Sequence, residues 1–483
     1  RLVGSEMCIR DRVFSLDNES GKPLYQQIYE YIKEEIMQGR LSYREKLPSA
    51  RELAASLLVS RNPVDTAYEQ LVAEGYVYAV SQKGYYVSEI TYIREYCGQK
   101  KEIPLQEEEH TPVCWKYNFN PDEVDSSHFP YATLRSIARN VMDREEFLCS
   151  GNAQGEEAFR RQVAKYLYRS RGVQCELSQI VIGAGIGYLL QLLSVLFRKN
   201  GKIAFEEPGY VRAKQIFASY GFDIVNVEIA EENITPEELD RAQTRLCYLT
   251  PSHQFPLGTV MPAPERQRLL KWAREKEGRY LIEDDHDSEY RYKGKPIPAM
   301  QSLDPDGKVI YIGTFSKVIT PALRLGYMVL PKELVSVFHR ECGAYNCPVS
   351  RLDQQIVTTF MAEGHFDKHL NRMRKIYREK HDVVLSELQK YPEKVKVHGD
   401  YAGLYVIAEV RTKKSEEQMV REAAEKEIYL RPLSVYYRNS KTAGNPAFLL
   451  GFAVPDTDTI KRGISLLCEE IFKKILVFVP KLY

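Results

Sequence analysis

The sequence lacks the features that would assign the chain to several large protein classes. Its nine cysteines are spread over 483 residues without a C-x-x-C pair, which argues against a disulfide framework and indicates free thiols in a reducing compartment. No apolar run approaches the roughly 20 residues that a membrane helix needs, and we expect no secretory signal. These absences predict a cytoplasmic protein that does not enter a membrane.

An excess of charge of one sign is also missing, since 67 Lys and Arg stand against 66 Asp and Glu. A net charge of +1 argues against a protein that coats nucleic acid by bulk charge, but it permits a local binding face. The hydrophobic content of 44% is ordinary for a globular protein. Because 483 residues are too many for one compact core, several domains are expected.

Composition divides the chain into four segments. Residues 1–12 (RLVGSEMCIRDR) lack an initiating methionine and fit no element, so we expect a non-native scar there. Residues 13–90 carry closely spaced helix signals, and residues 91–115 are polar and aperiodic, as a linker is. Residues 116–476 alternate short apolar runs with longer helical stretches, which predicts an α/β domain with a largely parallel sheet and a smaller C-terminal α+β lobe.

Residues 22–84 predict three helices followed by a β-hairpin. Ser49, with Glu52 three residues later, forms a capping box at the start of the second helix. Ser60 is placed as the N-cap of the third helix. Two β-rich runs flank the turn at 82–84, which is typical of a hairpin. This order of elements predicts a winged helix-turn-helix.

The third helix would be the recognition helix, with its N-terminal residues facing base edges in the major groove. Arg61 and Asn62 lie at that N-terminus, and these residue types suit bidentate reading of guanine and adenine. Charge alone does not favour DNA over a generic three-helix domain, since residues 22–90 hold eight Lys and Arg against nine Asp and Glu. The predicted DNA-binding residues are Arg44, Lys46, Ser49, Arg51, Ser60, Arg61, Asn62, Thr66 and Lys83, the last at the wing tip.

Two residues of the α/β region suggest a site for pyridoxal 5′-phosphate (PLP). Such a site needs a lysine that forms an imine and a carboxylate that keeps the pyridine nitrogen protonated. Lys317 follows an apolar strand within GTFSK, and Asp284 ends another within IEDDHDSE, where ligands bind in open α/β sheets. A lone loop lysine is more often a surface residue, and the acidic cluster alone is equally compatible with Mg²⁺ or with solvent.

A phosphate cradle is predicted where GAGIG lies between a strand and a helix, because backbone N–H groups at a helix N-terminus bind anions. Rossmann-type turns look similar, so this signal is weak alone. Thr314 and Arg324 flank Lys317 and can reach the same phosphate, Arg324 with a two-pronged guanidinium. The predicted loop residues are Gly183, Ala184, Gly185 and Ile186.

Three further residues follow predicted strands. Tyr210 in EEPGY can stack on the cofactor ring, with an ordinary core tyrosine as the alternative. Arg212, two residues later, is a candidate contact for a carboxylate of an effector. His253 or Gln254 in TPSHQFPLG can approach the ring hydroxyl, and a core or turn-capping histidine is equally compatible with the sequence.

Together these strings resemble the MocR/GabR subfamily of GntR-type transcription regulators. LPSARELAASLLVSRNPVDTAYEQLVAEG, followed by KGYYV, resembles the GntR class over about 65 residues. EEPGY, TPSHQFP, IEDD-x-DSE, GTFSK and LGFA then occur in the family order. The resemblance implies a winged helix-turn-helix fused to a fold-type I, PLP-dependent transferase fold with a large α/β domain and a small lobe. It also implies a head-to-tail homodimer.

The resemblance assigns roles to individual residues. Lys317 would be the imine lysine, Asp284 would hold the pyridine nitrogen and Tyr210 would stack on the ring. Thr314 and Arg324 would bind the phosphate.

The sequence departs from the family pattern at three positions. His286 stands where the GABA-responsive member has a tyrosine that bonds the ring O3′; imidazole can also make that bond, but it titrates near neutral pH. Val435 stands where that member has an arginine that grips the effector carboxylate. Pro63 replaces a common hydroxyl residue in the recognition helix.

The sequence therefore predicts a PLP-dependent regulator of a double-stranded DNA operator. It would sense a small amine or amino acid through external aldimine formation and a shift between two states. An active aminotransferase with a vestigial DNA-binding domain is the alternative, because the same Lys317 can transfer protons. A regulator that no longer binds cofactor is disfavoured by the presence of Lys317, Asp284 and Arg324.

Overall fold

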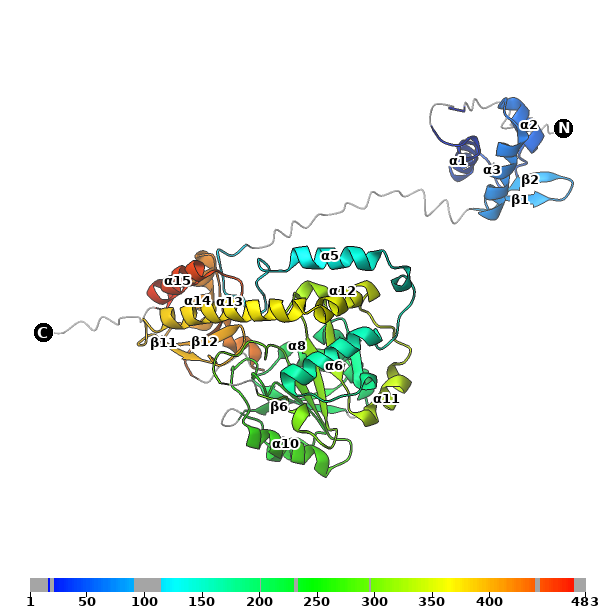
Figure 1. The fold of residues 1–483 in the computed structure, drawn as a ribbon. Helices are drawn as coiled ribbons and strands as arrows, with labels where there is room; N and C mark the ends of the chain where they lie inside the picture. The colour runs from blue at the N-terminus through cyan, green and yellow to red at the C-terminus, as the bar shows by residue number, and fades with distance from the viewer. Residues whose placement is uncertain are drawn as a thin grey trace. The chain divides into compact units, whose positions relative to one another are not determined.

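The structure is a computed structural model in which the chain forms two compact units, residues 1–112 and 113–483 (Figure 1). The predicted scar at residues 1–12, and all but the last two residues of the predicted linker at 91–115, lie outside the described residues. The described residues are 16–17, 21–90, 114–199, 201–229, 233–294, 297–438 and 444–472.

The N-terminal unit is a winged helix-turn-helix, as predicted. Its apolar core gathers Ile28, Ile32 and Ile36 of the first helix with Val64 and Leu71 of the third, at helical spacing. The elements are α1 Leu24–Met37, α2 Ala50–Ser56, α3 Arg61–Ala73, and the antiparallel strands β1 Val77–Val80 and β2 Gly84–Val87.

The two predicted helix caps of this unit differ in the structure. Ser49 forms the capping box, since its Oγ accepts from the Glu52 N–H at 3.2 Å and Glu52 Oε2 accepts from the Ser49 N–H at 3.0 Å. Ser60 occupies the N-cap of α3, but its side chain makes no capping hydrogen bond. Pro63 stands at the third helical position and has no N–H to donate to it.

The C-terminal unit is built on a seven-stranded sheet in the order β4-β10-β9-β8-β7-β5-β6. Strands β5 to β9 pair in parallel, whereas β10 runs antiparallel to both of its neighbours, so the predicted largely parallel sheet is confirmed with one reversed strand. The strands are β4 Ile180–Gly183, β5 Lys202–Glu207, β6 Asp223–Glu228, β7 Leu246–Leu249, β8 Tyr280–Asp285, β9 Val309–Thr314 and β10 Gly326–Val329.

Both faces of this sheet are buried. In β9 the side chain of Tyr311 packs into one apolar cluster, while Ile310 and Ile312 pack into another on the opposite face. Helices supply the covering side chains on both sides. They are α5 Tyr131–Met142, α6 Glu157–Arg171, α7 Ile186–Leu196, α8 Val211–Ser219, α9 Pro236–Arg241, α10 Ala263–Glu275, α11 Lys332–Cys342, α12 Arg351–Ala362 and α13 His365–Leu388.

A smaller C-terminal lobe follows α13, the long yellow helix in Figure 1. Its four-stranded sheet has the order β11-β12-β15-β14, with β11 Val395–His398, β12 Tyr405–Val410, β14 Arg431–Pro432 and β15 Ala447–Gly451 paired antiparallel. Its helices are α14 Glu416–Glu425 and α15 Thr457–Leu466. This lobe confirms the predicted α+β end of the unit.

A short parallel pair joins the start of the C-terminal unit to this lobe. Strand β3, Tyr117–Asn118, pairs with β13, Ile428–Tyr429. The N–H of Tyr117 also donates to the Glu427 carbonyl at 3.1 Å. Single helical turns complete the unit: η2 Glu145–Phe147, η3 Leu177–Gln179, η4 Gln301–Leu303, η5 Pro321–Leu323, η6 Leu433–Tyr436 and η7 Leu467–Ile471.

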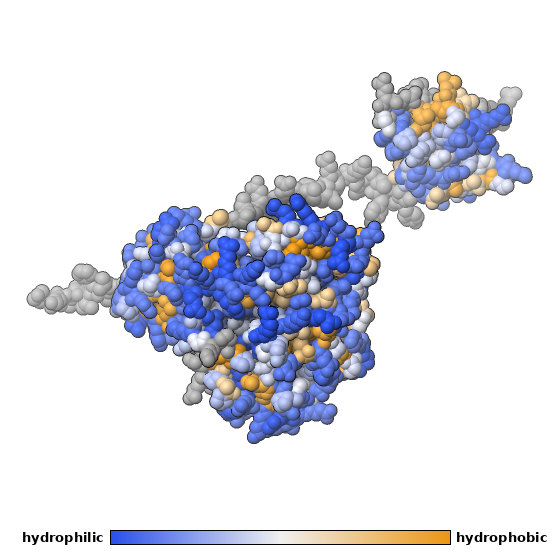
Figure 2. Space-filling model, viewed as in Figure 1, coloured by the Kyte–Doolittle hydropathy of each residue, from blue (hydrophilic) through white to orange (hydrophobic). Residues whose placement is uncertain are grey.

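The surface is mainly hydrophilic on the face shown in Figure 2, with scattered apolar spots. Within the described ranges, no helix has both the length and the apolar character needed to cross a bilayer.

Candidate functional site

The predicted site residues of the C-terminal unit gather where β7, β8 and β9 end. Tyr210 lies close enough to Asp284, Arg212 and Arg324 for their charges to act on its hydroxyl, and burial with Asp284 raises its pKa to about 12. The carboxyl ends of neighbouring parallel strands share one edge of the sheet, so residues distant in sequence meet there.

Lys317 stands three residues after β9 and is partly buried. Its Nζ donates to the Pro121 carbonyl at 2.8 Å. Burial lowers the pKa of Lys317, and the carboxylates of Asp122 and Asp287 oppose that shift. A lowered pKa increases the fraction of neutral amine, which is the form that attacks a carbonyl carbon.

Asp284 lies near the end of β8 with a side chain that is almost fully buried. The Tyr248 hydroxyl donates to its Oδ2. Burial raises the pKa of Asp284 to about 7, assisted by the charges of Asp285 and Asp287. No described Lys or Arg forms an ion pair with this carboxylate, so it fits the task of facing a protonated ring nitrogen, which would supply the cation.

The other acids of this segment have partners of their own. Asp285 pairs with the buried Arg171 at 2.7 Å, and Glu283 accepts from the N–H groups of Met300 and Gln301 at 2.8 and 2.9 Å. These carboxylates point to different partners, which does not favour the alternative of a magnesium site formed by the acidic cluster.

His253 and His286 lie on either side of Asp287. His253 Nδ1 is 2.9 Å from Asp287 Oδ1, and His286 Nε2 is 3.3 Å from the same oxygen. Burial would raise the pKa of Asp287, but the two histidines lower it to about 2. Burial lowers the pKa of His286, which favours its neutral imidazole.

His253 keeps one ring nitrogen without a partner among the described residues. His253 Nε2 is buried without a hydrogen bond to the described residues, so it is available to a bound group. One ligand atom from each of His253, His286 and Asp287 lies within 4.8 Å of the others, so the trio is also able to hold a metal ion.

The residues of the predicted cradle lie in the β4–α7 loop. Gly183 ends β4, Gly185 is the N-cap of α7 with φ 79°, and Ile186 is its first residue. Arg324 Nη2 donates to the Ala184 carbonyl at 3.4 Å. A Cβ on Gly185 would lie 3.0 Å from the same Nη2 and would crowd the guanidinium at this helix N-terminus, and the positive φ also favours glycine here. Thr314 ends the neighbouring strand β9.

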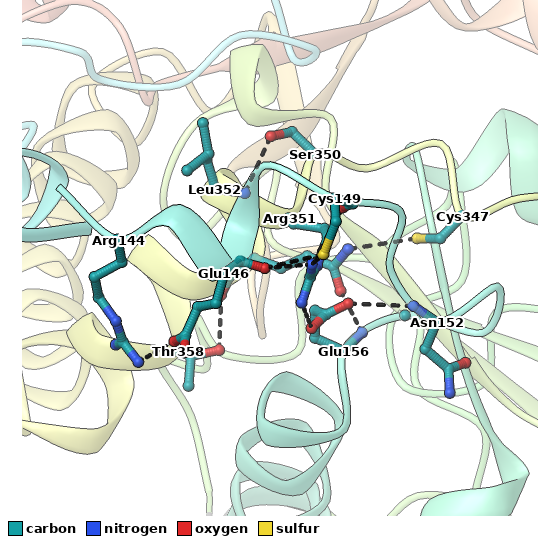
Figure 3. A network of polar contacts seen from close by, with 12 residues as sticks. Arg144, Glu146, Cys149, Asn152, Glu156, Cys347, Ser350, Arg351, Leu352 and Thr358 are labelled. Carbon is teal, nitrogen blue, oxygen red and sulfur yellow. Dashed lines mark hydrogen bonds and ion pairs between the residues drawn. The ribbon is translucent and has the colours of Figure 1, made fainter. Parts of the chain in front are cut away.

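A network of polar contacts around Arg351 holds the segment that precedes α6 (Figure 3). Arg351 Nη2 pairs with Glu156 at 3.0 Å, and its Nη1 donates to the Glu146 carbonyl at 2.6 Å. The Gln154 carbonyl then accepts from the N–H of Ile182 in β4 at 3.0 Å. Residues 144–156 are thereby fixed against the strand that carries the cradle.

Aromatic residues form one wall of the site. The rings of Tyr210 and Phe255 lie 5.9 Å apart edge to face, and Phe255 also contacts Tyr436 at 4.9 Å. Arg212, the second residue of α8, is exposed and pairs with no described residue. Val435 is 41% exposed and offers no polar group to a ligand.

Sequence reasoning missed three residues that reach this site. Tyr248 donates to Asp284, while Asp122, whose charge acts on Lys317, pairs with Arg431 at 3.3 Å. Tyr248 lies inside an apolar strand, Asp122 lies in a turn and Arg431 begins the two-residue strand β14, so no motif or periodicity singles them out.

All nine predicted DNA-binding residues are exposed on the N-terminal unit, which is described here by itself. Arg61 pairs with Asp65 at 3.0 Å on the solvent side of α3, and Thr66 Oγ1 donates to the Asn62 carbonyl at 3.0 Å. Residues 44–47 add to the wing, since Leu47 N–H donates to the Tyr85 carbonyl at 2.9 Å. Arg44 and Lys46 therefore lie along the wing with Lys83, whereas Arg51 lies on α2.

Known proteins match both units. The gntR family of bacterial regulatory proteins matches residues 24–87, and aminotransferase class I and II matches residues 118–463. The HTH-type transcriptional regulator YdeL of Bacillus subtilis is 39% identical over 448 residues, covering 92% of this chain and 96% of that protein. The probable rhizopine catabolism regulatory protein MocR of Rhizobium meliloti is 32% identical over 469 residues, covering 94% of each.

A solved structure matches the C-terminal unit. The kynurenine aminotransferase of Pyrococcus horikoshii, in complex with PMP, covers 74% of this chain and 90% of its own, with a TM-score of 0.64 and 26% identity. The order of the seven strands, the small lobe and the preceding winged helix-turn-helix agree with these matches. The chain therefore belongs to the MocR-type family of HTH transcriptional regulators, in which a gntR-type helix-turn-helix unit is fused to an aminotransferase-like unit.

Proposed function

We propose that this regulator binds PLP in its aminotransferase-like unit and senses a small amine or amino acid there. The observation that carries the proposal is the presence in one site of Lys317, whose pKa burial lowers, and of Asp284, a buried carboxyl without a cationic partner among the described residues. When bound, PLP supplies an aldehyde carbon that condenses with amines and a ring that withdraws electrons.

Different residues of the site would contact different parts of this cofactor. Lys317 would attach it through Nζ, Asp284 would face the ring nitrogen and Tyr210 would cover the ring. His286 and His253 would stand near the ring hydroxyl. The phosphate would lie on Gly183, Ala184, Gly185 and Ile186, with Thr314 and Arg324.

The helix-turn-helix unit implies DNA binding. We infer that α3 enters the major groove, with Arg61 and Asn62 toward the bases, and that Lys83 and Lys46 of the wing contact the backbone. Head-to-tail pairing of two chains would present two such units to one operator. The regulator would act in the cytoplasm, where free thiols persist.

An active aminotransferase is the competing function, favoured by the enzymes that share this fold and by the lowered pKa of Lys317. The two functions differ in their outcome, since a regulator changes its DNA affinity when an amine binds. Turnover without that change would support the enzyme.

Absorbance tests the cofactor. Cofactor-free protein titrated with PLP should gain a visible band that is lost in Lys317→Ala and kept in Lys271→Ala, a change on the exposed face of α10. A wild-type protein that stays colourless would refute the proposal.

A gel shift on DNA from upstream of the protein's own reading frame tests the helix-turn-helix unit. Arg61→Ala should weaken binding by about 1–3 kcal/mol, whereas Lys22→Ala, outside the predicted contacts, should not.

A further inference from the structure

Arg431 lies at the edge of the site, and its guanidinium forms a long, partly exposed ion pair. Its Nη2 donates to Asp122 Oδ2 at 3.3 Å, where the two side chains are 29% and 62% exposed. Its Nε is buried and makes no hydrogen bond to any described residue. The guanidinium carbon lies 5.4 Å from the centre of the Tyr429 ring. Such a guanidinium keeps donors free for a second carboxylate.

Asp122 joins Arg431 to the lysine of the site. Lys317 Nζ donates to the carbonyl of Pro121, the residue before Asp122, and the Asp122 carboxylate acts on the charge of Lys317. Burial raises the pKa of Tyr436, and the charges of Asp122 and Arg431 both act on that hydroxyl as well. The guanidinium is therefore linked to Lys317 through Asp122, and its charge reaches Tyr436 of the aromatic wall.

We propose that Arg431 binds the carboxylate of the effector, and that Asp122 holds Arg431 in the absence of effector. The inference rests on the proposed function and narrows the effector class to amino acids rather than simple amines. Exchange of one carboxylate for another keeps the charge balanced. Release of Asp122 costs little free energy because an ion pair whose carboxylate is 62% exposed contributes little stability. Arg431 thus supplies the cation that Val435 does not.

The exchange has a consequence for the segment 117–123. Arg431 and Lys317 both hold this segment, through Asp122 and Pro121. In the sequence it lies just after the stretch that connects the two units. An effector carboxylate on Arg431 removes one of these contacts, so carboxylate-bearing effectors should change DNA affinity more than amines do.

Spectral titration of the PLP-loaded full chain tests the assignment. The probes are pairs that differ by one carboxylate: L-alanine and ethylamine, L-glutamate and 4-aminobutyrate, and L-phenylalanine and phenethylamine. Arg431→Gln should raise the Kd of the amino acids that bind by about 10- to 100-fold. It should leave the Kd of ethylamine and phenethylamine and the cofactor band unchanged, and Arg431→Lys should recover part of the loss.

Two further variants complete the test. Arg411→Gln makes the same chemical change at an exposed residue just beyond β12 and should have no effect. Asp122→Asn removes the competing carboxylate and should lower the Kd of the amino acids several-fold. If wild type responds to amino acids and Arg431→Gln responds equally, the role of Arg431 is refuted and the proposed function stands. If wild type forms no cofactor band, the proposed function itself fails.

Discussion

Replacing Asp284 by asparagine should stabilise the cofactor-free protein above neutral pH. The carboxyl has an ordinary pKa of 3.8 in an unfolded chain, and burial raises it to about 7 in the folded protein. The folded state therefore binds the proton more tightly. The contribution of this carboxyl to the free energy of unfolding is largest below about pH 4. It is lost as the pH rises from about 4 through about 7.

The magnitude follows from the two pKa values. The difference between 3.8 and about 7 corresponds to about 4 kcal/mol at alkaline pH. About 3 kcal/mol of this is lost between pH 5 and pH 8. The asparagine variant stays neutral throughout and still accepts from Tyr248, so its stability should not show this loss.

Tryptophan fluorescence during urea unfolding measures this difference. The two tryptophans, Trp115 and Trp272, both belong to the C-terminal unit, so the signal reports on that unit alone. Asp223→Asn, at an exposed position in β6, is the matched control and should follow wild type. Equal pH dependence of wild type and Asp284→Asn would show that burial does not perturb this carboxyl. Addition of PLP should reverse the order of stability, since a pyridinium favours the charged aspartate.

Two other substitutions test local features. Gly185→Ala should weaken PLP binding about tenfold and destabilise the fold by about 1 kcal/mol, because φ is 79° and the new Cβ meets Arg324. Gly187→Ala, whose Cβ would meet nothing closer than 3.9 Å, should bind PLP normally, and equal affinities in an absorbance titration would contradict this account of the cradle. Ser49→Ala should cost about 1 kcal/mol at the start of α2 and speed hydrogen exchange there. Ser60→Ala should leave exchange in α3 unchanged, because the Ser60 hydroxyl makes no cap.

The sequence determined the local structure and most of the predicted site. Helical periodicity and the capping box at Ser49 predicted the helix-turn-helix, and alternating apolar runs predicted the α/β unit. The ends of those runs carried Asp284 and Lys317. These features depend on residues that are close together in the chain, so a short window of sequence is enough to predict them.

Tertiary structure alone decided the contacts that tune the site. Asp122 and Arg431 are 309 residues apart in the sequence, and Pro121 and Lys317 are 196 apart. No periodicity or spacing in the sequence predicts either contact. Each forms because β3 and β13 pair and because the small lobe packs beside the ends of β8 and β9. Such contacts follow from the packing of whole elements, which a pattern of neighbouring residues does not encode.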